Sequence, residues 1–207
     1  MGLSPGQKNN LKIKKLDRSF YYRPTLEVAR DLIGKRIIRI LSGKTLTGRI
    51  IETEAYRGKD DAASHARRGI TKRNTPMFST PGTTYVYFIY GMHWLFNISA
   101  HIEGMPGGVL IRALEPESGL ESMCRFRGTS STNTLTNGPA RLAQALHIDS
   151  DLNNIDLVTH TGLYLVDGSL ADHERIASGP RVRVPGDKLA KQRLWRFWVA
   201  DHPLLSR

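Results

Sequence analysis

The sequence contains only one cysteine, Cys124, among 207 residues. An intrachain disulfide is therefore impossible, and no group of cysteines and histidines has the spacing of a zinc site. No apolar run approaches the roughly 18 residues that a membrane-spanning helix needs. The first residues, MGLSPGQKNNLKIKK, also lack an apolar run long enough for a signal peptide. These absences predict an intracellular chain without a structural metal and without a membrane-spanning segment.

Acidic side chains are few: the chain has 19 Asp and Glu but 30 Lys and Arg. The formal charge is therefore +11, and the sequence pI is near 10.0. Such a chain attracts polyanions, so nucleic acid is the leading candidate partner and an anionic membrane surface the second. Hydrophobic residues make up 40% of the chain, enough to bury a sizeable core in one domain. We expect a basic flexible tail over residues 1–16 and one domain over residues 17–207.

The remaining pattern predicts an α+β domain, because strands come in pairs with helices between them. Helices are expected from Thr25 to Gly34, over residues 120–126, and from Pro139 onward, where proline suits a first helical turn. The charged stretch 57–81 lacks periodicity and is expected to be an irregular loop with a function. Alternating or apolar segments predict strands at residues 35–41, 45–56, 83–90, 92–99, 107–116 and 194–200.

The segment IIETEAY places two acids and a ring on one face of a strand. The side-chain period of two directs Glu52, Glu54 and Tyr56 to the same side. The acids can be solvated charges or partners of arginines. Alternatively, one carboxylate lies in a cleft beside an aromatic platform and acts as a base toward water. A glycoside hydrolase that uses both acids is disfavoured, because their parallel side chains cannot flank a bond from opposite sides.

Aromatic residues are only 8% of the chain, yet six of them lie in the segment TTYVYFIYGMHWLFN. Tyr85 and Tyr87 project to one side, either into a core or toward a flat ligand. Phe88 and Ile89 suit the core of a buried sheet. Tyr90 directly precedes the expected turn glycine, where a ring is exposed and has the properties of a wedge between bases.

The order of short motifs along the chain resembles one known family. The motifs are IETEAY, SHARRG, KRNTPMF, PGTTYVYFIYGM, FNIS, VLIRALEP and NGPARLAQAL. Together they closely resemble the alkyladenine (3-methyladenine) DNA glycosylase family, whose members extrude a damaged purine from duplex DNA and hydrolyse its N-glycosidic bond. The resemblance covers nearly the whole chain after the tail and is strongest over residues 48–116. It implies a curved antiparallel sheet with peripheral helices, and a β-hairpin that inserts into DNA.

The resemblance also implies roles for individual residues. Glu54 corresponds to the general base, and Arg112 to an arginine near the catalytic water and the backbone phosphate. Asn97, which by itself would be only a strand-end residue, corresponds to the residue that excludes normal guanine. The rings of the base-binding pocket correspond to Tyr56, His65 and Tyr87, the side chain that fills the gap in the duplex is Tyr90, and the DNA-facing surface includes Arg73, Asn74 and Met77.

The implied enzyme is monofunctional and uses water directly, without a cofactor or a metal. Its expected partner is double-stranded DNA with a damaged purine such as 3-methyladenine, 7-methylguanine or hypoxanthine. We expect a monomer in the cytoplasm or nucleoid, or in the nucleus of a eukaryote. The alternative is a noncatalytic nucleic-acid-binding protein whose tyrosines form a stacking platform and for which Glu54 is incidental. Two departures from the family pattern are Arg183, where a small residue is usual, and the residues Trp94, Leu95 and Phe96.

Overall fold

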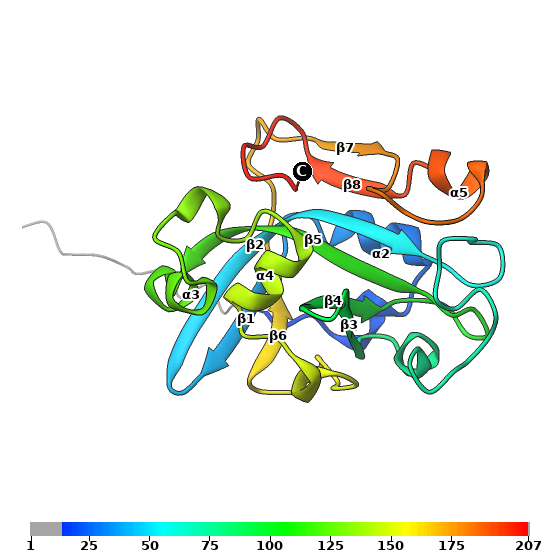
Figure 1. Ribbon diagram of the computed structural model, residues 1–207, viewed down its shortest axis with the longest axis horizontal. Helices are drawn as coiled ribbons and strands as arrows, with labels where there is room; N and C mark the ends of the chain where they lie inside the picture. Colours follow the sequence, from blue (N-terminus) through cyan, green and yellow to red (C-terminus); the bar gives the residue numbers. More distant parts are fainter. Residues whose placement is uncertain (1–13, 207) are drawn as a thin grey trace, which may run out of the picture.

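The computed structural model describes residues 14–206, and one curled antiparallel sheet organises them (Figure 1). The sheet has eight strands in the order β3-β4-β5-β2-β1-β6, with β8 paired to β2 and β7 paired to β8. The expected α+β domain with a curved antiparallel sheet is confirmed. The strands are β1 (Arg36–Leu41), β2 (Lys44–Tyr56), β3 (Thr84–Ile89), β4 (His93–Ser99), β5 (Gly108–Ser118), β6 (Leu163–Val166), β7 (Ile176–Gly179) and β8 (Arg196–Val199).

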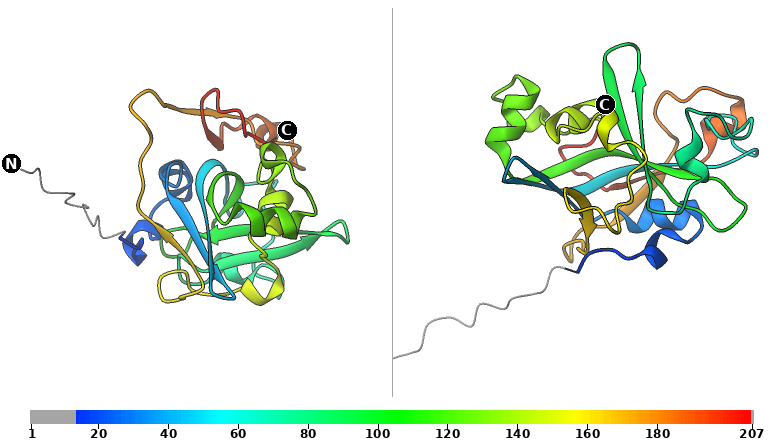
Figure 2. Two further views of the ribbon diagram at one scale, coloured as in Figure 1. Left: turned by 90° about the vertical axis from the view of Figure 1, so that its left-hand side faces the viewer. Right: turned by 90° about the horizontal axis from the view of Figure 1, so that it is seen from below.

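Helices cover both faces of this sheet. Helix α2 packs on β2 and β5, whereas α4 packs on β4 and β5 from the opposite face (Figure 2). Pro139 begins α4 as expected, because the N–H that proline lacks has no partner within a helix at that position. No helix within residues 14–206 is both long and apolar enough to cross a membrane. The helices are α1 (Arg18–Tyr21), α2 (Thr25–Asp31), α3 (Leu120–Arg127), α4 (Pro139–Ala145) and α5 (Lys188–Gln192), with 3-10 helices η1 (Thr75–Phe78), η2 (Thr132–Thr134) and η3 (Ser150–Leu152).

Strand β2 is the central element, and its two faces are distinct. One edge pairs with β5, while the other pairs first with β1 and then with β8. Thr53 faces α2, since its hydroxyl donates a hydrogen bond of 2.7 Å to the carbonyl oxygen of Ala29. Glu52 and Glu54 alternate with Thr53 and therefore face the side on which α4 lies. The predicted common face of the two acids is confirmed.

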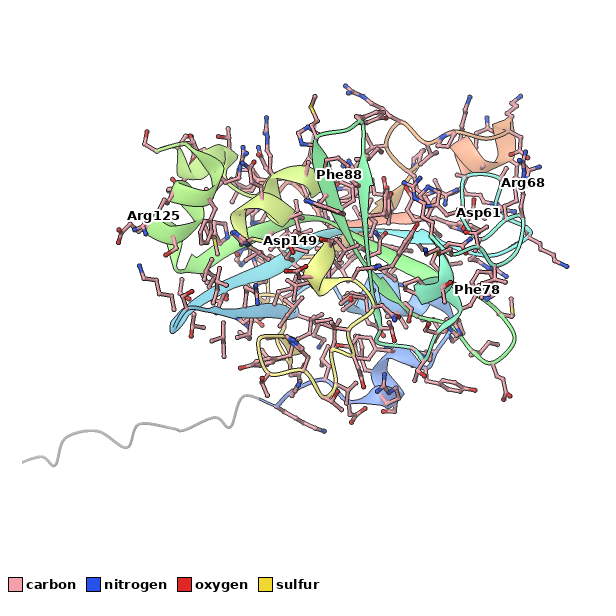
Figure 3. All side chains as sticks on the ribbon, turned by 60° about the horizontal axis from the view of Figure 1, so that its bottom comes forward. Asp61, Arg68, Phe78, Phe88, Arg125 and Asp149 are labelled. Atoms are coloured by element: carbon pink, nitrogen blue, oxygen red, sulfur yellow. The ribbon has the colours of Figure 1, made fainter. Side chains whose placement is uncertain are left out.

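The β3–β4 hairpin projects beyond the sheet, as Figure 3 shows at the labelled Phe88. Only residues Asn97–Ser99 of β4 pair with β5, so the distal half of the hairpin has no neighbouring strand. Phe88 is 44% exposed and packs against Trp94, with ring centroids 4.7 Å apart. The prediction that Phe88 belongs to the core was wrong for this reason. Phe96, closer to the sheet, is fully buried.

The sequence-based boundaries differ from the structure at the N-terminal side. Leu16 is buried and its N–H bonds to the carbonyl of Leu165, and Lys15 forms a β-bridge with Val166. Residues 14–16 of the predicted tail are therefore part of the folded domain, and residues 1–13 lie outside the described residues. Thr25 does not cap α2; its hydroxyl donates to the carbonyl of Ala100. Strands β6 and β7, of four residues each, were not predicted.

The two phenylalanines give a stability prediction. Phe96→Ala leaves a cavity in the core and is expected to lower the free energy of unfolding by about 3–5 kcal/mol. Phe88→Ala, in the paired strand, removes a half-exposed ring and should cost clearly less. Urea unfolding of both variants measures the difference. Equal losses would show that the distal hairpin is as tightly packed as the core.

Candidate active site

A cleft of about 570 Å³ opens between the β3–β4 hairpin, the first turn of α4 and residues 182–185. It lies on the face of the sheet to which Glu52 and Glu54 point. Seven of the residues to which the family resemblance gives a role line it, and they come from the end of β2 and the loop after it, from η1, from the hairpin and from β5. These residues are Tyr56, His65, Met77, Tyr87, Tyr90, Asn97 and Arg112.

Glu54 is fully buried directly behind the wall of this cleft. Its Oε1 accepts a hydrogen bond from the backbone N–H of Val182 at 2.6 Å, and its Oε2 accepts bonds from the Tyr56 hydroxyl at 2.8 Å and from Arg112 Nη1 at 3.2 Å. All three donors belong to cleft-lining residues. Burial, reinforced by the charge of Glu54, raises the pKa of Tyr56 well above its usual value, so its hydroxyl remains a donor.

Arg112 lies between the two acids of β2. Its Nε donates to Glu52 at 3.0 Å while Nη1 donates to Glu54, and its Nη2 donates to the hydroxyl of Ser206 at 2.9 Å. Burial alone would lower the pKa of Arg112, but the carboxylates of Glu54 and Glu52 outweigh that effect and raise it. Glu52 also accepts a bond of 2.6 Å from Arg196. Glu52 is thus an arginine partner, one of the alternatives that the sequence left open.

Tyr85, Tyr87 and His65 form a wall of packed rings. The Tyr87 centroid lies 5.0 Å from that of Tyr85 and 4.8 Å from that of His65, and His65 Nδ1 lies 2.9 Å from the Tyr85 hydroxyl oxygen. The guanidinium of Arg73 stacks over Tyr87 at 5.2 Å. His65 and Tyr87 thus contact each other, and both line the cleft together with Tyr56.

The opposite side of Tyr56 is supported by an ion pair that the sequence analysis missed. The Arg181 guanidinium lies 4.7 Å from the Tyr56 ring centroid and forms two bonds of 2.7 Å with Asp61. Both charged side chains are fully buried, so the pair lies behind the ring and not in the cleft. Arg181 directly precedes Val182, whose N–H donates to Glu54. No local pattern links Asp61 to a residue 120 positions away.

The tip of the hairpin exposes apolar side chains at the edge of the cleft. Tyr90 is 84% exposed, and Met92, which the sequence analysis did not identify, is 67% exposed. Tyr90 and Gly91 have φ values of 54° and 67°, the successive positive values of a type I′ turn. The N–H of Met92 donates to the carbonyl of Ile89 and closes the turn. The exposed ring is thus held on a hydrogen-bonded turn.

Asn97 is buried at the base of the hairpin, with 5% of its surface exposed. Its Nδ2 donates to the carbonyl oxygen of Tyr85 in the paired strand at 3.0 Å, which fixes the orientation of the amide. Asn97 also lines the cleft. The Asn97 side chain therefore makes a structural hydrogen bond and also borders the cleft.

Two residues expected on the DNA-facing surface are buried instead. Asn74 is 1% exposed, and its Nδ2 donates to the carbonyls of His65 and Gly69, so its amide holds the loop together. Met77 is 3% exposed and packs with Tyr85 beneath the cleft. Asn74 does not line the cleft, whereas Met77 forms part of the cleft wall beside Tyr85. Arg73 remains exposed.

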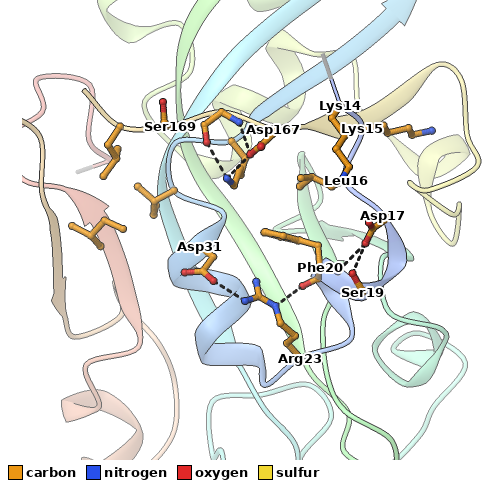
Figure 4. A pocket seen from close by; sticks show the side chains of 15 residues that line it. Lys14, Lys15, Leu16, Asp17, Ser19, Phe20, Arg23, Asp31, Asp167 and Ser169 are labelled. Carbon is orange, nitrogen blue, oxygen red and sulfur yellow. Dashed lines mark hydrogen bonds and ion pairs between the residues drawn. The ribbon is translucent and has the colours of Figure 1, made fainter. Parts of the chain in front are cut away.

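A second, larger cleft of about 710 Å³ lies between the first described residues and the segment after β6 (Figure 4). None of the residues singled out from the sequence lines it. Two of its cations are already paired, Arg23 with Asp31 at 2.8 Å and Lys35 with Asp167 at 2.6 Å. The smaller cleft is the candidate active site, because only it joins a buried carboxylate to an aromatic wall.

Comparison with known proteins agrees with the motifs. Residues 19–203 match the family described as methylpurine-DNA glycosylase. A protein of Chlorobium phaeovibrioides is 43% identical over 196 residues, which covers 94% of this chain and 98% of the relative. A protein of Salinibacter ruber is 42% identical, covering 92% and 96%, and one of Clostridium tetani is 40% identical, covering 93% and 99%. All three are provisionally named 3-methyladenine DNA glycosylase. The chain therefore belongs to the methylpurine-DNA glycosylase family.

Proposed function

We propose that this protein is a monofunctional DNA glycosylase that extrudes an alkylated or deaminated purine from duplex DNA and hydrolyses its N-glycosidic bond. The observation that carries the proposal is the position of Glu54, whose three hydrogen-bond donors all belong to residues that line an aromatic cleft. Membership of the family and the provisional names of the relatives support the same reaction.

The aromatic cleft fits an extruded purine. Extrusion costs a few kcal/mol, less for a damaged or mispaired base. Stacking on an aromatic ring returns about 1–3 kcal/mol, so contact with Tyr56 and with the joined wall of Tyr87 and His65 roughly offsets that cost. Alkylation at a ring nitrogen makes a purine cationic, which strengthens its attraction to an electron-rich ring and makes it a better leaving group.

Glu54 can position and deprotonate the attacking water. A carboxylate has about four acceptor sites, and Oε1 of Glu54 uses only one of its two, for the N–H of Val182. In the proposed step, the water oxygen bonds to the sugar carbon C1′, the C1′–N bond breaks with its electron pair leaving on the base, and the water proton passes to Glu54. The negative charge of Glu54 also stabilises the positive charge that develops on the sugar.

The hairpin and the overall charge explain how duplex DNA would be held. The charge of +11 attracts phosphates without regard to sequence. The exposed Tyr90 would enter the space that the extruded nucleotide leaves, and Arg73, exposed beside Tyr87, would face the backbone. We propose a monomer acting on double-stranded DNA, without a cofactor.

The direct test is to incubate the protein with duplex oligonucleotides that each carry one lesion, and to measure abasic sites. The set should include 3-methyladenine, 7-methylguanine, hypoxanthine and ethenoadenine. Product from at least one lesion is expected. Binding without product from any lesion would leave the noncatalytic stacking protein.

Glu54→Gln should abolish most excision because glutamine cannot accept the water proton. The expected loss in the single-turnover rate is at least about 100-fold. Affinity for lesion-containing duplex should persist, since charge and rings are unchanged. Glu121→Gln, on the exposed face of α3, is the matched control and should keep the wild-type rate. A Glu54→Gln variant with the wild-type rate would remove Glu54 from the base role.

Tyr90→Ala should shorten the lifetime of the extruded state, with little dependence on salt because no charge is lost. Ethenoadenine fluorescence in single-turnover experiments at two salt concentrations follows this state. Tyr87→Ala should weaken the grip on the extruded base itself. Tyr22→Ala removes another exposed tyrosine and serves as the control. Normal retention of the base by Tyr90→Ala would remove Tyr90 from the gap-filling role.

Asn97→Ser should relax the exclusion of guanine. The fixed Asn97 amide occupies the base of the cleft, where it would clash with the exocyclic amino group of guanine. Excision of guanine from mismatches is expected to rise by about tenfold. Excision of adenine, which lacks that group, is the internal control. Unchanged discrimination would limit Asn97 to its bond with Tyr85.

A further inference from the structure

Arg183 combines an unfavourable backbone conformation with a place in the wall of the active-site cleft. Its φ is 50°, in the left-handed region that residues with a Cβ avoid. Its side chain is exposed and lines the cleft. Backbone strain of this kind is retained mainly where the side chain or the chain path serves a function.

The charge of Arg183 is not neutralised within the cleft. The cleft-lining residues include two arginines, Arg112 and Arg183, and no lysine, aspartate or glutamate. Arg112 is buried and its guanidinium is engaged by Glu52, Glu54 and Ser206. Within residues 14–206, Arg183 makes no ion pair and no side-chain hydrogen bond, unlike its neighbour Arg181. Arg183 is therefore the arginine of this cleft that is available to an anion.

Arg183 directly follows a residue that contacts the carboxylate of Glu54. The preceding residue, Val182, donates its N–H to Glu54 at 2.6 Å. An anion bound by Arg183 would thus lie near the catalytic carboxylate but on the exposed side of the cleft. In extruded DNA, the anions that enter such a cleft are the phosphates that flank the flipped nucleotide.

We propose that Arg183 binds a phosphate adjacent to the extruded nucleotide and so retains the flipped DNA and its abasic product. This inference rests on the proposed function. A guanidinium suits the task because it remains charged and donates two bonds to one phosphate. Arg112 is unsuited to bind this phosphate, because its charge is already balanced by two carboxylates in the protein interior.

The test compares Arg183→Gly with Arg183→Lys in the full-length protein. Glycine accepts the positive φ, so Arg183→Gly should have an unfolding midpoint equal to or above that of the wild type. Its affinity for duplex DNA with a tetrahydrofuran abasic-site analogue should fall about tenfold, the usual effect of one bond to a charged group. The slope of log affinity against log salt should shrink by about 0.9, the value for one phosphate. Arg183→Lys should keep that slope.

Arg30→Gln is the matched control, because it removes one charge from α2 on the opposite face of the sheet. A loss for Arg183→Gly no larger than for this control would overturn the proposal. A second arm measures hypoxanthine-containing duplex in a Glu54→Gln background. Equal losses on hypoxanthine and abasic DNA support a phosphate contact, whereas a loss confined to hypoxanthine would show a base contact and overturn it. A wild-type protein with no preference for abasic DNA would instead contradict the proposed function itself.

Discussion

Burying Glu52 and Glu54 next to each other in β2 requires a positive charge between them, and Arg112 supplies it from β5. The pairing of β2 with β5 across Glu54 and Leu110 brings the guanidinium to both carboxylates. Two buried carboxylates without a counter-charge would be costly, and removing one partner of such a pair typically costs about 3–5 kcal/mol. The antiparallel pairing of two central strands is therefore also what fixes the chemistry of the site.

The two glutamates differ in their hydrogen-bond partners. Glu52 accepts hydrogen bonds from Arg112, Arg196 and Ser206, so its carboxylate is bound entirely by residues of the protein. Glu54 instead accepts hydrogen bonds from Val182, Tyr56 and Arg112, which all line the cleft. The two tyrosines of β3 both line the cleft, but Tyr85 is buried and Tyr87 is half-buried. Tyr85 packs against Tyr87 and against His65, and these contacts restrain the orientation of the Tyr87 ring.

The sequence predicted well those features that depend on neighbouring residues. The hairpins, the place of Pro139, the irregular loop and the common face of the two acids all follow from local periodicity or turn chemistry. Prediction was weaker where the outcome depends on a distant partner. Phe88 has the pattern of a core residue, but it lies in the part of the hairpin that no longer pairs with β5. Asn74 has the polarity of a surface residue, but it faces carbonyls of its own loop.

By itself the sequence determined the family, because seven short motifs occur in one order, and it predicted seven of the side chains that line the cleft. Only the tertiary structure decided how they act together. It placed Arg181 behind Tyr56, the N–H of Val182 on Glu54, and Arg183 in a strained position within the cleft. These contacts join segments more than 120 residues apart, and the energy that selects them comes from burial and charge pairing, which no local pattern encodes.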